Sequence, residues 1–141
     1  MIYIAVSPKR YLSILCQGRH AIHPIKEGVD MGILFQYQLQ QMHRDTRAYC
    51  AILDTKDQRE VGKWVGIFMA MDWGFEVIDS KTWMDYFGLY PESKKEQDNH
   101  WMSVARLRYP MMSVKKDNYE AILTACYLHD KYENEKRMVF A

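Results

Sequence analysis

Cysteines are few in this chain and lie far apart. Cys16, Cys50 and Cys126 form no Cys-x-x-Cys pair, and the five histidines add no zinc-ligand spacing to them. An odd number of scattered cysteines argues against a disulfide framework, and the missing motif argues against a structural zinc site. We therefore expect buried thiols and a reducing, cytoplasmic setting.

Long apolar runs and targeting signals are lacking as well. No apolar run approaches 18 residues, so we expect no membrane-spanning segment. Residues 1–6 are apolar but too few for the core of a signal peptide. There is no repeat and no low-complexity tract, and a composition that is 48% hydrophobic and 13% aromatic suffices for a real core. We predict that residues 1–141 form a single domain.

The chain also has little excess of basic charge. Its 19 lysines and arginines stand against 18 acidic residues, which leaves a net charge of +1. Domains that bind nucleic acid usually carry a clear basic excess, so the total charge is a weak argument for that class. A local basic patch can still exist, because net charge conceals how the charges are distributed.

The first part of the chain is predicted to form three short strands. Residues 2–6 form an apolar run of β type, and Pro8 ends it because proline cannot donate to a central ladder. Residues 11–16 form a second run. A glycine turn separates it from a third run, residues 20–23, which Pro24 closes. Three strands joined by tight turns predict an antiparallel meander.

The pattern then changes to helical spacing. Met31, Phe35, Leu39 and Met42 recur at intervals of four, four and three, and Asp30 stands where a helix cap belongs. These residues predict the first helix of the chain.

The apolar run of residues 48–53 is too short for an ordinary helix. It fits a buried central strand, parallel to the first strand and ended by Asp54. A helix is predicted from Glu60 to Asp72, and a fifth strand over residues 75–78. Four apolar side chains of that helix are expected to face inward: Val61, Val65, Phe68 and Met69.

Helices and charged loops fill the rest of the chain. A short helix is predicted at residues 81–87, whereas residues 94–99 are charged and read as a loop or a solvated helix start. Two further helices are predicted, at residues 100–109 and from Asp117 to about Arg137, with a loop at 113–116 between them. The tryptophans are expected in the core or an interface rather than as platforms for bases: Trp64, Trp73, Trp83 and Trp101.

The predicted order, βββ-α-β-α-β-α-α, defines an α/β fold. Two crossovers after an antiparallel meander give a five-stranded mixed sheet with helices on its faces. Active sites in open sheets lie at the carboxyl ends of the central strands. Here those ends are Ser7 and Asp54, so we expect the functional site beside them.

Asp117 and Glu120 are the acids that could join such a site. They lie three positions apart at the start of the last predicted helix, so their side chains would share one face. Carboxylate oxygens suit hard cations such as Mg²⁺. A plainer alternative stays open, because acidic residues are common at helix starts, where the helix dipole favours them.

In order and spacing, these pieces resemble the RuvC-like Holliday junction resolvases, especially the short bacteriophage forms, within the ribonuclease H-like superfamily. The resemblance covers nearly the whole chain. Its motifs are Val6-Ser7-Pro8-Lys9, Ile52-Leu53-Asp54, Val77-Ile78-Asp79-Ser80-Lys81-Thr82-Trp83, Ser103-Val104-Ala105-Arg106-Leu107-Arg108-Tyr109-Pro110 and Asp117-Asn118-Tyr119-Glu120-Ala121-Ile122. It implies a ribonuclease H-like sheet and a homodimer, to which the helix from Glu60 to Asp72 is the expected contributor, although packing in the core explains the apolar face of that helix equally well. It also implies a phage protein acting in the cytoplasm of a bacterial host.

The resemblance also shows a departure. The family's nuclease holds two Mg²⁺ ions with four carboxylates, and the Asp at the end of its first strand bridges the ions. Ser7 stands in that place, and Asp54 stands where the family has Glu. We therefore expect weak binding of Mg²⁺ or Mn²⁺ at Asp54, Asp117 and Glu120, with Ser7 as a degenerate catalytic position.

Basic side chains in predicted loops are the candidates for contact with phosphates. Surface lysines are common, so an ordinary solvated surface explains them equally well. The residues are Lys9, Arg10, Lys94, Lys95, Lys115 and Lys116.

The leading expectation is a degenerate resolvase-like protein that binds branched or other DNA with little or no junction cleavage. It would act by occupying DNA or by engaging a protein of replication or defence. One alternative is an active, metal-dependent Holliday junction endonuclease. A second is a protein-interaction module that keeps only the scaffold.

Overall fold

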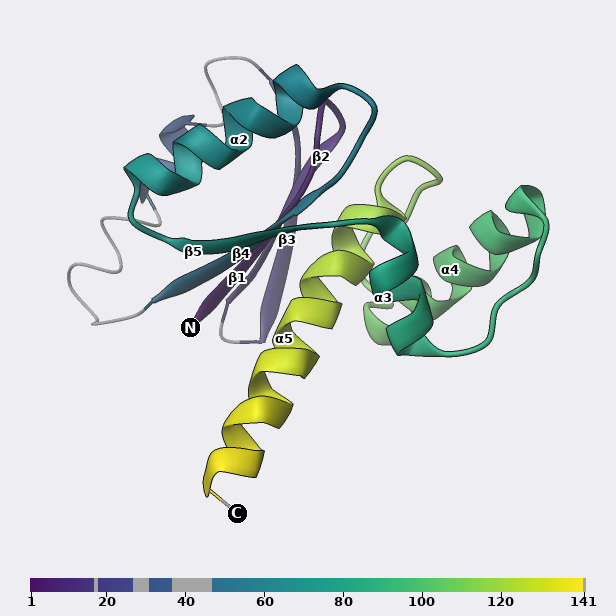
Figure 1. Ribbon diagram of the computed structural model, residues 1–141. Coiled ribbons are helices and arrows are strands. Elements are labelled where there is room, and N and C mark those ends of the chain that lie inside the picture. Colours follow the sequence, from purple (N-terminus) through teal and green to yellow (C-terminus); the bar gives the residue numbers. More distant parts are fainter. Residues whose placement is uncertain (17, 27–30, 37–46, 141) are drawn as a thin grey trace.

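The computed structural model describes residues 1–16, 18–26, 31–36 and 47–140, with side chains as far as Glu135. Within these ranges it has five strands and a series of helices around them (Figure 1). Two residues of the first predicted helix, Leu39 and Met42, and its predicted cap Asp30 lie outside the described residues. The described part of that segment, residues 31–36, is helical, with Leu34 buried and both Met31 and Phe35 exposed.

The five strands form one mixed sheet in the order β3-β2-β1-β4-β5. The hairpin strands β1, β2 and β3 pair antiparallel, whereas β1, β4 and β5 run parallel. The predicted α/β class, with a five-stranded mixed sheet, is thereby confirmed. The strands are β1 (Ile2–Ser7), β2 (Tyr11–Cys16), β3 (Arg19–Pro24), β4 (Ala48–Leu53) and β5 (Gly74–Ile78).

The sheet is covered on both faces, which explains the unbroken apolar runs of β1 and β4. Side chains alternate along a strand, so Ile2, Ile4 and Val6 enter one core while Tyr3 and Ala5 enter the other. Helix α2 (Gln58–Ala70) covers the first face, and α5 (Tyr119–Phe140) covers the second (Figure 1). The second core continues into α3 (Ser80–Phe87) and α4 (Lys94–Arg108).

Helix α2 begins two residues earlier than predicted because Asp57 caps it. The Asp57 carboxylate accepts a hydrogen bond from the Glu60 amide at 3.3 Å. Its buried face holds Val61, Trp64 and Phe68. The prediction that Met69 faces inward is wrong: its side chain is 65% exposed, because it lies one residue, or about 100° of helix rotation, beyond Phe68.

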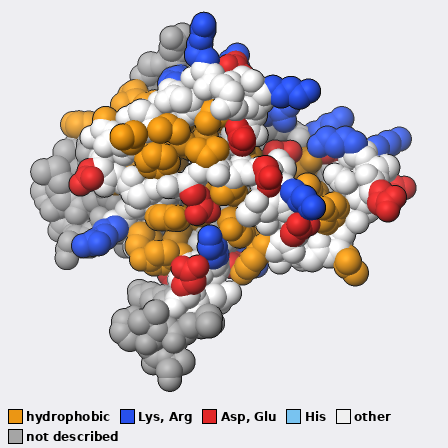
Figure 2. Space-filling view, in the orientation of Figure 1, with side chains coloured by type: hydrophobic (Ala, Val, Ile, Leu, Met, Phe, Trp, Pro, Cys, Tyr) orange, Lys and Arg blue, Asp and Glu red, His pale blue; other side chains and the backbone are white. Residues whose placement is uncertain are grey.

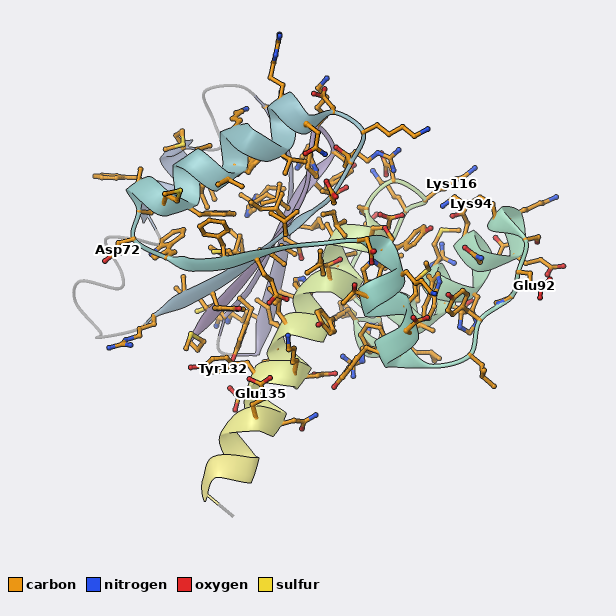
Figure 3. All side chains as sticks on the ribbon, in the orientation of Figure 1. Asp72, Glu92, Lys94, Lys116, Tyr132 and Glu135 are labelled. Carbon is orange, nitrogen blue, oxygen red and sulfur yellow. The ribbon has the colours of Figure 1, made fainter. Side chains whose placement is uncertain are left out.

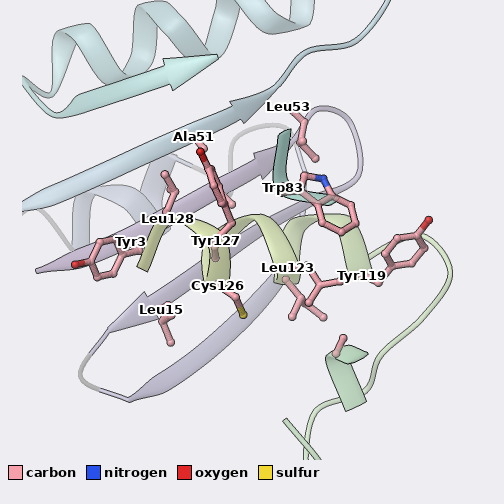
Figure 4. Packing of buried hydrophobic residues seen from close by; sticks show 14 of the residues in the cluster. Tyr3, Leu15, Ala51, Leu53, Trp83, Tyr119, Leu123, Cys126, Tyr127 and Leu128 are labelled. Carbon is pink, nitrogen blue, oxygen red and sulfur yellow. The ribbon is translucent and has the colours of Figure 1, made fainter. Parts of the chain in front are cut away.

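The four tryptophans are buried, as predicted. Trp83 of α3 and Trp101 of α4 meet edge to face at 5.1 Å between ring centroids, and Tyr119 packs against Trp83 at 6.4 Å. Figure 4 shows Trp83 and Tyr119 beside Leu53 and Leu123, where α5 lies against the sheet. The packing fixes the start of α5 relative to the carboxyl end of β4.

The start of α4 decides between the two alternatives predicted for residues 94–99, and the start of α5 differs from the prediction. Residues 94–99 are the first turns of α4, because the Ser93 hydroxyl accepts from the Glu96 amide at 3.3 Å and starts the helix there. Asp117 lies before α5 rather than in it. Asn118 closes the preceding turn by accepting from the Lys115 amide at 2.7 Å and donating to the Ser113 carbonyl at 3.0 Å.

None of the helices in the described ranges combines the length and the apolar character needed to cross a bilayer.

Candidate functional site

The carboxyl ends of β1 and β4 open onto one cavity of about 460 Å³. The parallel register pairs Val6 with Ile52, so Ser7 falls beside Leu53 and Asp54 follows one residue beyond, and both line this cavity. Glu120, from the first turn of α5, lines the same cavity. The structure thus brings together three of the four predicted site residues. Basic side chains also line it: Lys9, Arg10, Lys56 and Lys94.

Ser7 is the last residue of β1 and only 5% exposed. Its carbonyl accepts from the Arg10 amide at 2.9 Å, which closes a turn with Lys9 at a positive φ of 66°. Beyond that turn, the Lys9 ammonium lies 2.6 Å from the Asp57 carboxylate. Their hydrogen bond is the main cause that raises the pKa of Lys9 and lowers the pKa of Asp57.

The carboxylates of Asp54 and Glu120 accept hydrogen bonds from neutral donors. The Gln58 amide nitrogen donates to Asp54 at 2.9 Å, and the Ser80 hydroxyl donates to Glu120 at 3.3 Å. Both donors begin helices, α2 and α3, that start just beyond the strand ends. Asp54 is therefore held by the first residue of α2, and Glu120 by the first residue of α3.

Asp117 lies apart from Asp54. It is exposed and lines an adjoining cavity of about 590 Å³, with Glu120 common to both cavities. Across the described ranges, no three His, Cys, Asp or Glu side chains gather closely enough to hold a metal ion. The predicted ligand set of Asp54, Asp117 and Glu120 is thus divided between two cavities, and Ser7 adds only a neutral hydroxyl. These donors do not match a site with two ions and four carboxylates.

The predicted basic residues converge on the same two cavities. Arg10 and Lys94 line both of them, while Lys115 and Lys116 line the second. Lys95 is the exception, since it is exposed but lines neither. Figure 2 shows Lys and Arg side chains gathered at the upper right of the molecule, where Figure 3 labels Lys94 and Lys116 next to each other.

Beneath these lysines lies Asp98, which the sequence reading missed. Its side chain is 7% exposed and accepts a hydrogen bond from the Tyr119 hydroxyl at 2.5 Å. The ammonium groups of Lys94 and Lys116 lie 3.3 and 3.9 Å from its two oxygens. Desolvation acts to raise the pKa of Asp98, but the hydrogen bonds from Tyr119 and Lys94, with the charge of Lys116, hold it below its ordinary value.

A sequence signal for part of this arrangement exists. Lys94 and Asp98 are four positions apart, the spacing at which helix residues form ion pairs. That signal has meaning only if residues 94–98 are helical. No spacing links Asp98 to Lys116 or Tyr119, because these contacts depend on how α5 packs against α4.

A third cavity, of about 470 Å³, lies at the opposite end of β1, beside Met1 and Tyr3. Its polar groups are paired with one another. The Arg108 guanidinium lies 2.9 Å from the Asp130 carboxylate, and the Tyr3 hydroxyl donates to Glu133 at 2.9 Å. It holds none of the predicted site residues.

Comparison with protein-family models and with curated proteins found no match to this chain.

Proposed function

We propose that this protein binds DNA, branched DNA above all, along the basic rim of the two cavities, as a degenerate relative of the RuvC-like resolvases. The observation that carries the proposal is the convergence of cations from four separate segments at the carboxyl ends of β1 and β4. These segments are the β1–β2 turn, the loop between β4 and α2, the start of α4 and the loop before α5. Such a rim suits a phosphate backbone, which is bound mainly by lysine and arginine.

The distribution of charge supports an anionic ligand at the second cavity. Four cations and three carboxylates line it. One of these carboxylates, Asp98, is buried, whereas the side chains of Lys94 and Lys116 are 72% and 78% exposed. The positive groups therefore extend toward solvent, and part of the negative charge lies beneath them. A phosphate approaching this surface meets the ammonium groups first.

We also propose that the protein cleaves junctions little or not at all. A nuclease with two metal ions needs clustered carboxylates to hold both ions and activate water. At this edge, the place of the bridging acid is taken by the buried hydroxyl of Ser7, and the acids Asp54 and Glu120 are held by Gln58 and Ser80. Binding without incision would let the protein occupy junctions or present them to a protein partner.

Titration of the protein with a four-way junction and with linear duplex of the same length tests the binding. We expect tighter binding to the junction. Lys115→Ala with Lys116→Ala should weaken binding, and each lost phosphate contact should reduce the log–log salt slope by about 0.9. Lys95→Ala is the matched control, since Lys95 lines neither cavity, and it should leave the slope nearly unchanged.

Other results would favour the other candidate functions. Incision of the junction with Mg²⁺ or Mn²⁺ by the wild-type protein would show an active endonuclease. Failure to bind either DNA would overturn the proposal and leave a protein-interaction module. Equal effects of the Lys115/Lys116 and Lys95 variants would place the DNA elsewhere.

The proposal also includes a homodimer that uses the outer face of α2. Met69 on that face is 65% exposed, and Val77 on the edge strand β5 is 42% exposed. Figure 2 shows hydrophobic side chains gathered over α2 and β5. Sedimentation of the wild-type protein measures this directly, and a monomer at every concentration would remove the dimer from the proposal.

A further inference from the structure

Asp98 is the only buried acid in the described part of the chain. A buried carboxylate loses hydration and needs compensating partners. It has three, from different places in the sequence: Lys94 one helical turn earlier, Lys116 in the loop before α5, and Tyr119 at the start of α5. One carboxylate thus ties the start of α4 to the start of α5.

The two ion pairs contribute little to stability by themselves. Both lysine side chains are largely exposed, and exposed ion pairs are weak because water screens them. What the pairs do is restrict the two flexible side chains, which would otherwise lose rotamer entropy on meeting a ligand. Each ammonium group has three donor hydrogens, so it can keep Asp98 and still donate to a second acceptor.

We propose that Asp98 and Tyr119 are positioning residues that hold Lys94 and Lys116 as a two-pronged clamp for one phosphate of the DNA backbone. This inference rests on the proposed function and assigns a particular subsite to it. Asp98 orders both ammonium groups before DNA arrives. Tyr119 keeps the Asp98 carboxylate in place through its hydroxyl, while its ring stays packed against Trp83.

The variant Asp98→Asn distinguishes this clamp from an effect of net charge alone, because the two predict opposite changes in DNA affinity. Removing a negative charge beside the DNA should tighten binding if only net charge matters. The clamp predicts the reverse, since both lysines lose their anchor, and we expect binding about tenfold weaker. We also expect the log–log salt slope to fall by about 0.9, for one phosphate contact.

Glu96→Gln is the matched control for charge. Glu96 lies on the same first turns of α4, is exposed, and forms no ion pair in the described structure. Its neutralisation should leave binding unchanged or slightly tighter. Tyr119→Phe changes no charge but removes the donor to Asp98, so it should weaken binding in the same direction as Asp98→Asn.

A double-mutant cycle distinguishes the clamp from damage to the fold. In a background of Lys94→Met with Lys116→Met, Asp98→Asn has no lysine left to release, so it should cause no further weakening. An equal loss in that background would show a structural effect and overturn the clamp. Circular dichroism and thermal unfolding establish that each variant is folded.

The failures of the two proposals can be told apart. If the wild-type protein binds DNA and Asp98→Asn binds as tightly or more tightly, the clamp is wrong and the proposed function stands. If the wild-type protein binds neither junction nor duplex, the proposed function fails and the clamp fails with it.

Discussion

At the scale of single residues, His20 on the edge strand β3 is unusual in its surroundings. It forms a hydrogen bond with the Ser13 hydroxyl through Nε2, and its ring meets Tyr109 edge to face at 4.6 Å. Its Nδ1 is buried, with no partner in the described structure. Burial disfavours the charged imidazolium, and it lowers the pKa of His20 to about 4.

This pKa predicts a loss of stability in mild acid. The folded protein holds His20 neutral down to about pH 4, whereas an unfolded histidine takes up a proton near pH 6.5. The free energy of unfolding therefore has its full value, as far as His20 is concerned, above pH 6.5, and it decreases as the pH falls toward 4. Between pH 7.5 and pH 5 we expect the free energy of unfolding to fall by about 2 kcal/mol from His20 alone.

Chemical denaturation at the two pH values measures this, with His20→Gln as the control that does not titrate. Between pH 7.5 and pH 5, the free energy of unfolding of this variant should fall by about 2 kcal/mol less than that of the wild type. An identical pH dependence in both proteins would mean that His20 is protonated in the folded state without penalty.

At the scale of elements, the start of α4 decides where the basic rim lies. The run of residues 94–99 is charged and lacks an apolar stripe, which is why the sequence left it open as a loop or a solvated helix start. The local signal is Ser93 followed three residues later by Glu96, the spacing of a capping box. The cap starts the helix at Lys94, so that Lys94 and Asp98 fall one turn apart.

Ser93→Ala should therefore cost about 1 kcal/mol of stability, the usual effect of losing a serine cap. Ser103→Ala is the matched control on the same helix. Ser103 is exposed and its hydroxyl donates back to the Asn99 carbonyl, a bond that does little for a helix interior. That change should be neutral or slightly stabilising. Denaturant midpoints compare the two, and equal midpoints would mean that Ser93 does not cap the helix in solution.

At the scale of the whole molecule, the sheet could be predicted from the sequence, whereas the contacts between helices α4 and α5 could not. The unbroken apolar runs of residues 2–6 and 48–53 indicate two central strands, because a strand buried on both faces is apolar throughout. Ser7 and Asp54 then follow at the same edge of the sheet. The contact of Asp98 with Lys116 depends on how α4 and α5 pack, and no local pattern records it. For the same reason, Asp117 was expected beside Asp54 but lines the other cavity.

The charge of the cleft as a whole, which several elements supply, governs its response to metal. Four cations line the first cavity with four carboxylates, those of Asp54, Asp57, Glu60 and Glu120, and Ser7 contributes no charge. Ser7→Asp would place a fifth carboxylate there, nearly buried, where it loses hydration and meets the other acids. We expect this variant to be less stable than the wild type without metal. We also expect it to be stabilised by Mn²⁺, because a divalent ion relieves the repulsion among the carboxylates.

Thermal unfolding with and without Mn²⁺ measures this linkage. At about 100 times Kd, a bound ion contributes about 2.7 kcal/mol, which raises Tm on the order of 8 °C for a chain of this length. In the control Ser7→Asn, the new side chain is similar in size to that of aspartate but carries no charge. The Tm of this variant, like that of the wild type, should not respond to Mn²⁺. A response of the wild type as large as that of Ser7→Asp would show that the existing acids already suffice. No response from a folded Ser7→Asp variant would mean that position 7 is not where a bridging carboxylate belongs, and the alignment of β1 with the resolvase family would fail with it.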